Sequence, residues 1–205
     1  MTRWDARAGW RRAAVAVAVV LLAPVAQAQP GAGDAKALER GARLIGFCAN
    51  CHGANGNSTA PEIPNLAGQN AAYLEEQMRR FIDGRRKDPF MAGLIKAMSP
   101  TERADAVAYL SAQPMQPSAP RAAAAQIAEG QAYYAKVCFR CHGDQARGDA
   151  AVPRLAGQQP GYVVKSLKRY RDGTGERLEP VMAANTKMMS DAQIQAVAAY
   201  VASLR

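Results

Sequence analysis

The sequence predicts an all-α protein made of two tandem small helical domains, which are related by an internal repeat and joined by a proline-rich linker. Three observations support this prediction. Landmark residues recur at an offset of 89 to 91 positions, each half ends in a helix-capping pattern, and no stretch alternates apolar and polar residues as a half-buried strand would. The chain has 205 residues, a length that suits one or two domains.

The internal repeat is the main organising feature of the chain. The pattern C-x-x-C-H-G occupies residues 48–53 and returns at 138–143, and P-x-L-A-G-Q occupies 64–69 and returns at 153–158. Further landmarks recur at offsets of 89 or 91: Tyr73 and Tyr162, Asp83 and Asp172, Met91 and Met182, Met98 and Met189, Tyr109 and Tyr200. So many landmarks in step predict two structurally equivalent halves.

The repeat divides the chain into domains. We expect residues 29–113 to form the first domain, 114–124 the linker and 125–205 the second domain. Prolines at 114, 117 and 120 favour an extended linker. Each half has only about 80 residues, a size at which a cofactor or a cross-link usually has to supplement the hydrophobic core.

Local patterns predict where helices begin. Ser99 and Glu102 form a capping box with proline at the first turn, and Ser190 and Gln193 are its counterpart. Each box leads into an alanine-rich segment with apolar residues at helical spacing, so each half should close with a helix. The stretch before this last helix, which carries Met91 or Met182, is expected to be an irregular loop.

The first 28 residues have the pattern of a secretory signal peptide. Four arginines come first, an apolar run covers 13–23, and Ala26-Gln27-Ala28 forms a small-x-small cleavage site. The apolar run is shorter than the roughly 20 residues that span a bilayer, although an uncleaved N-terminal anchor is the alternative. We therefore expect export to the periplasm, with the protein either free there or peripheral to the membrane.

The net charge of the chain is +9, and removal of four arginines and one aspartate with residues 1–28 lowers it to +6. Basic residues are scattered among acidic ones, and no basic run with interleaved aromatic residues is present. This distribution does not favour nucleic acid as a partner.

The two C-x-x-C-H segments have the pattern for covalent attachment of a c-type haem. Two cysteines on one helical turn reach the two vinyl groups of one porphyrin, and the next residue then lies under the iron. The sequence therefore predicts two covalently bound haem c groups. The expected attachment residues are Cys48, Cys51, Cys138 and Cys141, and the expected proximal iron ligands are His52 and His142.

Other uses of four cysteines are open at this point. Two C-x-x-C pairs could hold one zinc ion through four sulfur atoms, and exported cysteines commonly form disulfides. Neither alternative gives the two following histidines a role. A thioredoxin-like dithiol would need a βαβ context that this sequence lacks.

The opposite side of each iron needs a second axial ligand. The chain has two histidines, both in the motifs, so bis-histidine ligation within the chain is excluded. Methionine is the expected ligand, with lysine or an open site as alternatives. Met91 and Met182 are preferred because both follow Pro-x and each has a repeat partner. Met98 and Met189 are the second choice, because a residue beside a helix cap commonly packs as a hydrophobic staple.

Together these motifs resemble cytochrome c4, a family of two-domain dihaem cytochromes whose halves each adopt the small helical cytochrome c fold. The resemblance extends from about Asp34 to Leu204. It implies that Met98 and Met189 occupy positions where the family usually has leucine, and that the distal methionine falls at Met91 and Met182. It also implies that the backbone oxygens of Pro64 and Pro153 accept hydrogen bonds from the axial histidines.

Histidine and methionine together fill both axial positions, so the expected function is one-electron transfer rather than enzymatic turnover of a small-molecule substrate. The resemblance implies delivery of electrons from a quinol-oxidising complex to a terminal oxidase. The expected partners are redox protein donors and acceptors, membrane-bound respiratory complexes among them. A cytochrome subunit of a larger periplasmic dehydrogenase is the alternative. A dihaem peroxidase is less favoured, since it needs a displaceable ligand and a nearby acid–base group.

Overall fold

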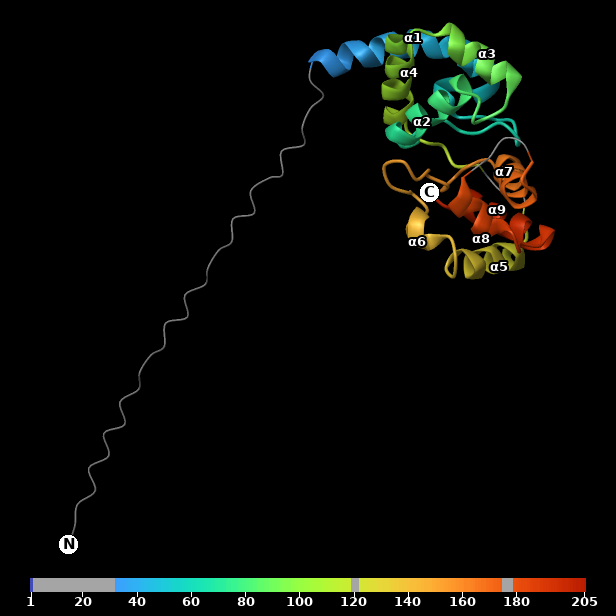
Figure 1. The fold of residues 1–205 in the computed structure, drawn as a ribbon. Helices are drawn as coiled ribbons and strands as arrows, with labels where there is room; N and C mark the ends of the chain where they lie inside the picture. The colour runs from blue at the N-terminus through green and yellow to red at the C-terminus, as the bar shows by residue number, and fades with distance from the viewer. Residues whose placement is uncertain (2–31, 119–121, 175–178) are drawn as a thin grey trace.

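The computed structural model describes Met1 and residues 32–118, 122–174 and 179–205. The predicted signal peptide therefore lies outside the described residues, apart from Met1. Figure 1 shows two helical bodies, the first half in blue to green and the second in yellow to red, stacked one on the other. Within the described residues the β structure is an isolated bridge between Asp149 and Val152. The predicted all-α class and two tandem domains are confirmed.

The helices follow the repeat. In the first half they are α1 (Ala32–His52), the short 3-10 helix η1 (Ala54–Gly56), α2 (Ala71–Ile82), α3 (Pro89–Ala97) and α4 (Pro100–Ala112). In the second half they are α5 (Ala124–Tyr134), α6 (Phe139–His142), α7 (Pro160–Asp172), α8 (Pro180–Thr186) and α9 (Asp191–Ser203). The single helix α1 thus corresponds to α5 and α6 together. Of the predicted linker, Pro120 lies outside the described residues.

In each half the N-terminal helix packs across the C-terminal one, α1 on α4 and α5 on α9. Gly41 and Gly130 lie at these crossings, where a Cβ atom would overlap the backbone oxygen of Asp105 or Ala196. Apolar side chains fill the two cores. The first core contains Ile45, Leu74, Ala106, Val107 and Leu110, and the second contains Tyr134, Val163, Ile194, Val197 and Val201. Burial of these side chains is the main favourable contribution to folding.

Both predicted capping boxes are present. The Ser99 hydroxyl accepts from the Glu102 N–H at 3.2 Å, and the Glu102 carboxylate accepts from the Ser99 N–H at 2.8 Å. Ser190 and Gln193 make the equivalent pair at 3.1 and 3.0 Å. Each box satisfies two backbone donors that have no partner within the helix, which fixes where α4 and α9 begin.

The prediction of an irregular loop around Met91 and Met182 is wrong, because both methionines lie in short helices, α3 and α8. Pro89 and Pro180 occupy the first turns of these helices. Proline is favoured there because its fixed φ suits a helix and its missing N–H would have had no partner. In α3 the Asp88 side chain also accepts from the Met91 N–H at 3.1 Å. The Pro-x-Met pattern therefore marks a helix start rather than a loop.

The two halves meet through their P-x-L-A-G-Q segments. Gln158 of the second half brackets Asn65 of the first, because its Oε1 accepts from the Asn65 N–H at 2.7 Å and its Nε2 donates to the Asn65 oxygen at 3.0 Å. Gln69 of the first half brackets Arg154 in the same way, at 2.8 and 3.0 Å. The interface is therefore reciprocal, with equivalent residues exchanging roles across it.

One buried charge distinguishes the two halves. Asp105 on α4 is 4 % exposed and receives two hydrogen bonds from Arg40 on α1, at 2.6 and 2.7 Å. The equivalent positions in the second half are Glu129 and Ala196, since Gly41 corresponds to Gly130 and Tyr109 to Tyr200. The Arg40 guanidinium lowers the pKa of Asp105 below its usual range through these hydrogen bonds. A bidentate arginine pair therefore cross-links α1 and α4 in the first half alone.

Replacing Asp105 with asparagine should destabilise the first domain in a pH-dependent way. A carboxyl group with a lowered folded pKa stabilises the protein at any pH above its unfolded value of about 3.9, and this contribution is lost as the pH falls through the lower folded value. The difference in free energy of unfolding between wild type and Asp105→Asn should therefore be full at pH 7 and shrink below about pH 4. Urea unfolding at several pH values measures this, with the exposed Glu39→Gln as a control that should change little. A difference that does not vary with pH would contradict the assignment.

Candidate haem sites

The first candidate site is an apolar cavity at the C-terminal end of α1. The last turn of α1 carries Cys48, Cys51 and His52 into its lining, and Met91 of α3 lines it as well. Apolar side chains from four helices and the 64–69 segment complete it: Ile45, Leu66, Met78, Leu94, Ile95, Met98, Ala106 and Leu110. The structure thus brings together all four residues predicted to hold the first haem, within an apolar shell that suits a porphyrin.

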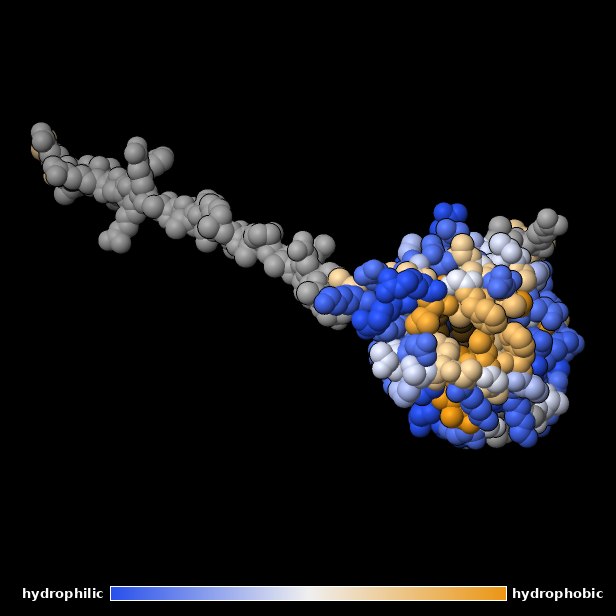
Figure 2. Space-filling model, turned by 90° about the horizontal axis from the view of Figure 1, so that it is seen from above, coloured by the Kyte–Doolittle hydropathy of each residue, from blue (hydrophilic) through white to orange (hydrophobic). Residues whose placement is uncertain are grey.

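The cavity opens on the surface of the first half. Figure 2 shows a hollow on this face surrounded by hydrophobic residues. Phe47 and Phe90 both line the cavity and are 61 % and 65 % exposed. Exposed apolar residues that gather around one opening commonly mark a ligand or partner site. An apolar rim therefore surrounds the entrance to the predicted haem site.

The orientation of His52 suits a metal ligand. Its imidazole is 8 % exposed, and Nδ1 lies 2.9 Å from the backbone oxygen of Pro64. Because a carbonyl oxygen can only accept, Nδ1 carries the hydrogen and Nε2 keeps its lone pair. Burial also lowers the pKa of His52, against the opposing effect of the Pro64 oxygen. The ring is therefore neutral at pH 7, as iron ligation requires.

The second half repeats this arrangement. His142 is 5 % exposed, and its Nδ1 lies 3.0 Å from the Pro153 oxygen. Burial lowers the pKa of this imidazole as well. The hydrogen bonds expected at Pro64 and Pro153 are therefore both present. Met182 lies in α8 and is half-buried, whereas Met188 is exposed to solvent.

The alternative methionines behave as packing residues. Met189 is 5 % exposed and belongs to the second core. Met98, at the end of α3, packs against the first core, although it also reaches the cavity wall. Met115 of the linker lies between the halves, beside Gly68 and Gly157. Met189 thus packs in the core as predicted, whereas Met98 lies both against the core and in the lining of the cavity that Met91 lines.

Within the part of the chain that the structure describes, no disulfide joins the four cysteines, and no three His, Cys, Asp or Glu side chains cluster. The four cysteines are therefore not gathered in one place, as a single four-sulfur zinc site would require. Desolvation raises the pKa of Cys48, and it raises that of Cys138 to about 11. Cys48 and Cys138 are half-buried, while Cys51 and Cys141 are exposed to solvent.

The surroundings of the two sites are not identical. The Tyr134 hydroxyl donates to the Gly143 oxygen at 2.6 Å, just after the second C-x-x-C-H motif. The equivalent position in the first half is Ile45, which lies four residues after Gly41 as Tyr134 lies four residues after Gly130, and it has no hydroxyl. A buried hydrogen bond thus supports one motif and not the other.

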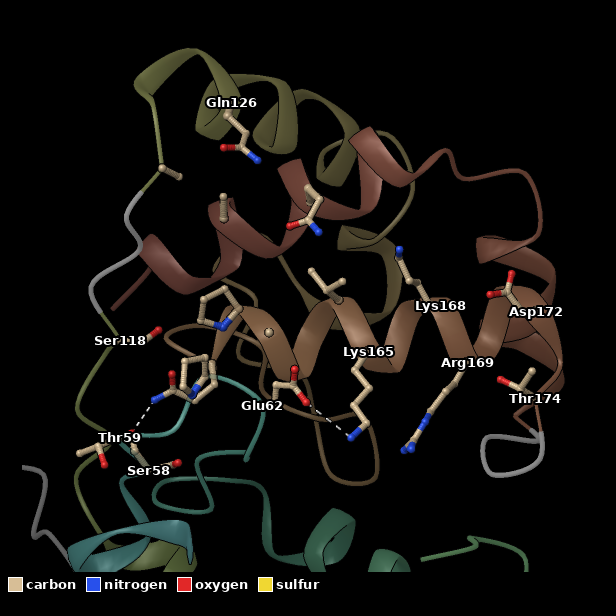
Figure 3. Close-up of a pocket in the computed structure, with 18 residues that line it drawn as sticks. Ser58, Thr59, Glu62, Ser118, Gln126, Lys165, Lys168, Arg169, Asp172 and Thr174 are labelled. Carbon is tan, nitrogen blue, oxygen red and sulfur yellow. Dashed lines mark hydrogen bonds and ion pairs between the residues drawn. The ribbon is translucent and has the colours of Figure 1, made fainter.

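A larger cleft lies between the halves, beside α7 (Figure 3). Its wall is polar and charged, and Lys165 faces Glu62 across it at 3.8 Å. The residues that line it include no cysteine, histidine or methionine. This cleft therefore does not have the chemistry of a haem site.

Sequence reasoning missed the part that two glutamines play at the interface. Gln69 and Gln158 were visible only as the last letters of the repeated P-x-L-A-G-Q segments. Their side chains cross to the opposite half and lie against the residue that follows Pro64 or Pro153. The available signal was a polar residue kept at the end of both repeats.

None of the helices described by the structure has the length and apolar character needed to cross a membrane.

Comparison with known proteins agrees with this geometry. The family model described as Cytochrome c matches residues 38–114 and 127–205, one match for each half. Cytochrome c4 of Pseudomonas aeruginosa is 35 % identical over 185 residues, covering 84 % of this chain and 90 % of that protein. The thiosulfate dehydrogenase electron acceptor of Thiomonas intermedia is 36 % identical over 169 residues, covering 76 % and 77 %.

Among solved structures, reduced recombinant cytochrome c4 from Pseudomonas stutzeri superimposes with a TM-score of 0.74 and 29 % identity, covering 82 % of this chain and 98 % of that one. Both halves are matched by one family and the whole arrangement is matched by a two-domain relative. The chain therefore belongs to the cytochrome c family, as a dihaem electron-transfer protein of the cytochrome c4 type with two covalently bound haem c groups.

Proposed function

We propose that this protein is a periplasmic electron carrier in which His52 and Met91 ligate one haem iron, and His142 and Met182 ligate the other. The observation that carries the proposal is the common cavity, which is lined by Cys48, Cys51, His52 and Met91. When bound, each haem supplies a one-electron couple of its iron. The protein's own contribution is to attach, orient and shield it.

Each group in the cavity has a distinct part in this function. The thiols of Cys48 and Cys51 would hold the porphyrin edge as thioethers, and Nε2 of His52 would approach the iron from one side. Met91 would close the other side with a neutral sulfur, which favours the ferrous state relative to stronger donors. The apolar wall excludes water, which also affects the potential.

Both axial positions are then filled by protein, so little rearrangement accompanies gain or loss of an electron. The sequence has two histidines, both in the haem-attachment motifs, so no third histidine could serve as an acid–base group. This supports an electron carrier over a dihaem peroxidase. The exposed Phe47 and Phe90 would give a redox partner a small apolar contact close to the haem, as suits brief encounters.

The electron donor and acceptor belong to the same proposal. The relatedness to cytochrome c4 supports delivery from a quinol-oxidising complex to a terminal oxidase. The relative named as an electron acceptor of thiosulfate dehydrogenase supports a second candidate, in which a periplasmic dehydrogenase is the donor. Native mass of the exported protein separates a free carrier from a permanent subunit, and stopped-flow mixing with each type of complex identifies the faster donor.

Ligation by Met91 and Met182 predicts a spectroscopic result. The purified ferric protein should show the weak far-red band that reports sulfur ligation, and Met91→Ala and Met182→Ala should each remove about half of it, since each haem contributes one Fe–S bond. Neither haem of the reduced wild-type protein should take up carbon monoxide. Met98→Leu and Met189→Leu are the matched controls and should leave the band intact. A full band in both Met91→Ala and Met182→Ala would show that other residues ligate the irons.

A further inference from the structure

We propose that Gln158 and Gln69 are positioning residues that set the axial histidine of the opposite domain, so that each domain adjusts the reduction potential of the other domain's haem. This inference rests on the assignment of His52 and His142 as iron ligands. It goes beyond that assignment by placing a determinant of each potential in the neighbouring domain.

A single peptide unit connects Gln158 to His52. The oxygen of the Pro64–Asn65 peptide accepts from His52 Nδ1 at 2.9 Å, and the N–H of the same peptide donates to Gln158 Oε1 at 2.7 Å. The amide nitrogen of Gln158 returns a hydrogen bond to the Asn65 oxygen at 3.0 Å. The Gln158 side chain is thus hydrogen-bonded to both backbone groups of Asn65, and the Pro64–Asn65 peptide in turn orients the His52 imidazole.

The same connection runs in the opposite direction. The oxygen of the Pro153–Arg154 peptide accepts from His142 Nδ1 at 3.0 Å, and the Arg154 N–H donates to Gln69 Oε1 at 2.8 Å. Gln69 Nε2 completes the bracket on the Arg154 oxygen at 3.0 Å. The same set of hydrogen bonds thus occurs in both directions across the interface, with closely similar lengths.

Burial makes these bonds effective. Gln69 and Gln158 are 6 % and 5 % exposed, and Asn65 is 2 % exposed. Water is therefore a poor substitute for either amide, and hydrogen bonds polarise one another more strongly in such surroundings. An N–H that donates to Gln158 makes the carbonyl of its own peptide a better acceptor from His52.

The consequence for the iron follows from the chemistry of imidazole. A stronger hydrogen bond from Nδ1–H increases the basicity of the ring and fixes its rotation. A more basic ligand stabilises ferric iron and lowers the reduction potential. Loss of the Gln158 bracket should therefore raise the potential of the first haem, and loss of the Gln69 bracket should raise that of the second.

The test is a redox titration of the dihaem protein with Gln158→Leu and Gln69→Leu. In Gln158→Leu we expect the reduction equilibrium of the first haem to shift about threefold to tenfold toward the ferrous state, where tenfold corresponds to 59 mV. The second haem should keep its wild-type potential. Gln69→Leu should give the opposite pattern. Proton resonances shifted by each ferric iron should move for the same haem, because they report the orientation of the axial ring.

Gln159→Leu is the matched control. Gln159 is also buried at the interface, where its amide donates to the Ser58 oxygen at 2.5 Å and to the side-chain oxygen of Asn65 at 3.4 Å, but it makes no hydrogen bond to either peptide that orients a histidine. This variant should weaken domain contact while leaving both potentials unchanged. If Gln158→Leu loses a haem, Gln158→Met, which is closer in length, replaces it.

Equal shifts in the reduction potentials of both haems in all three variants would show that the glutamines act only as general interface contacts. Unchanged potentials in a Gln158 variant that keeps both haems would overturn the inference. Failure of the histidine assignment would be seen separately, because His52→Ala and His142→Ala would then leave the spectra of both haems unchanged.

Discussion

Alanine at both Cys48 and Cys51 should leave the protein with one covalently bound haem instead of two. These thiols lie one helical turn apart on α1 and line the first cavity together with His52. Without them the porphyrin would be held only by its axial ligands and by apolar contact. Haem counted by its reduced pyridine complex, against protein mass, measures the result.

The same variant should also unfold in its first domain at lower denaturant concentration. The apolar residues around the cavity pack against a porphyrin in the complete protein, and its loss leaves a void that about 80 residues cannot readily close. The Cys138→Ala and Cys141→Ala double variant is the mirror control, and should keep the first haem and lose the second. Mass spectrometry of proteolytic peptides then assigns the remaining haem. Two attached haems in either variant would contradict the two-site arrangement.

Substitution of Gly41 by alanine should produce a large loss of stability. A Cβ atom there would overlap the Asp105 carbonyl oxygen and the Tyr109 Cβ, both on α4. Since one obstacle is backbone, the two helices would have to separate, and overpacking of this kind costs about 1–3 kcal/mol or more. Urea unfolding of the two-haem protein measures the change.

Gly46 provides a control on the same helix. No atom lies within 4 Å of a Cβ built at this position, so Gly46→Ala should gain about 0.5–1 kcal/mol from the higher helix propensity of alanine. Opposite signs at Gly41 and Gly46 would locate the effect in the crossing of α1 and α4. Equal effects would show that helix propensity alone decides both. Gly130, at the crossing of α5 and α9, should behave as Gly41 does.

Features set by neighbouring residues could be predicted from the sequence. The capping box of Ser99 and Glu102 needs only three positions of separation, so its pattern is readable without a fold. The C-x-x-C-H motifs are local for the same reason, and the repeat then predicts that the second half follows the first. This is why the all-α class and the cysteines and histidines of both motifs could be predicted from the sequence.

Features that depend on residues far apart in the sequence could not be predicted from it. Arg40 and Asp105 are 65 positions apart, and Gln158 lies 93 positions from Asn65, so neither pair leaves a periodic signal. The short helices α3 and α8 were missed for a different reason. The stretch before each closing helix was expected to be a loop, although proline at the first helical turn favours a helix.

The reciprocal contact of the P-x-L-A-G-Q segments has the geometry of an isologous interface, the kind that two copies of one subunit form about a twofold axis. Here both copies lie on one polypeptide, and the short tether keeps their effective concentration high without any need for oligomerisation. In a homodimer every substitution occurs in both subunits. In this protein a substitution changes one half only, so Arg40 and Asp105 can cross-link the first half while Tyr134 stabilises the second, and two halves with different side chains can share one symmetric interface.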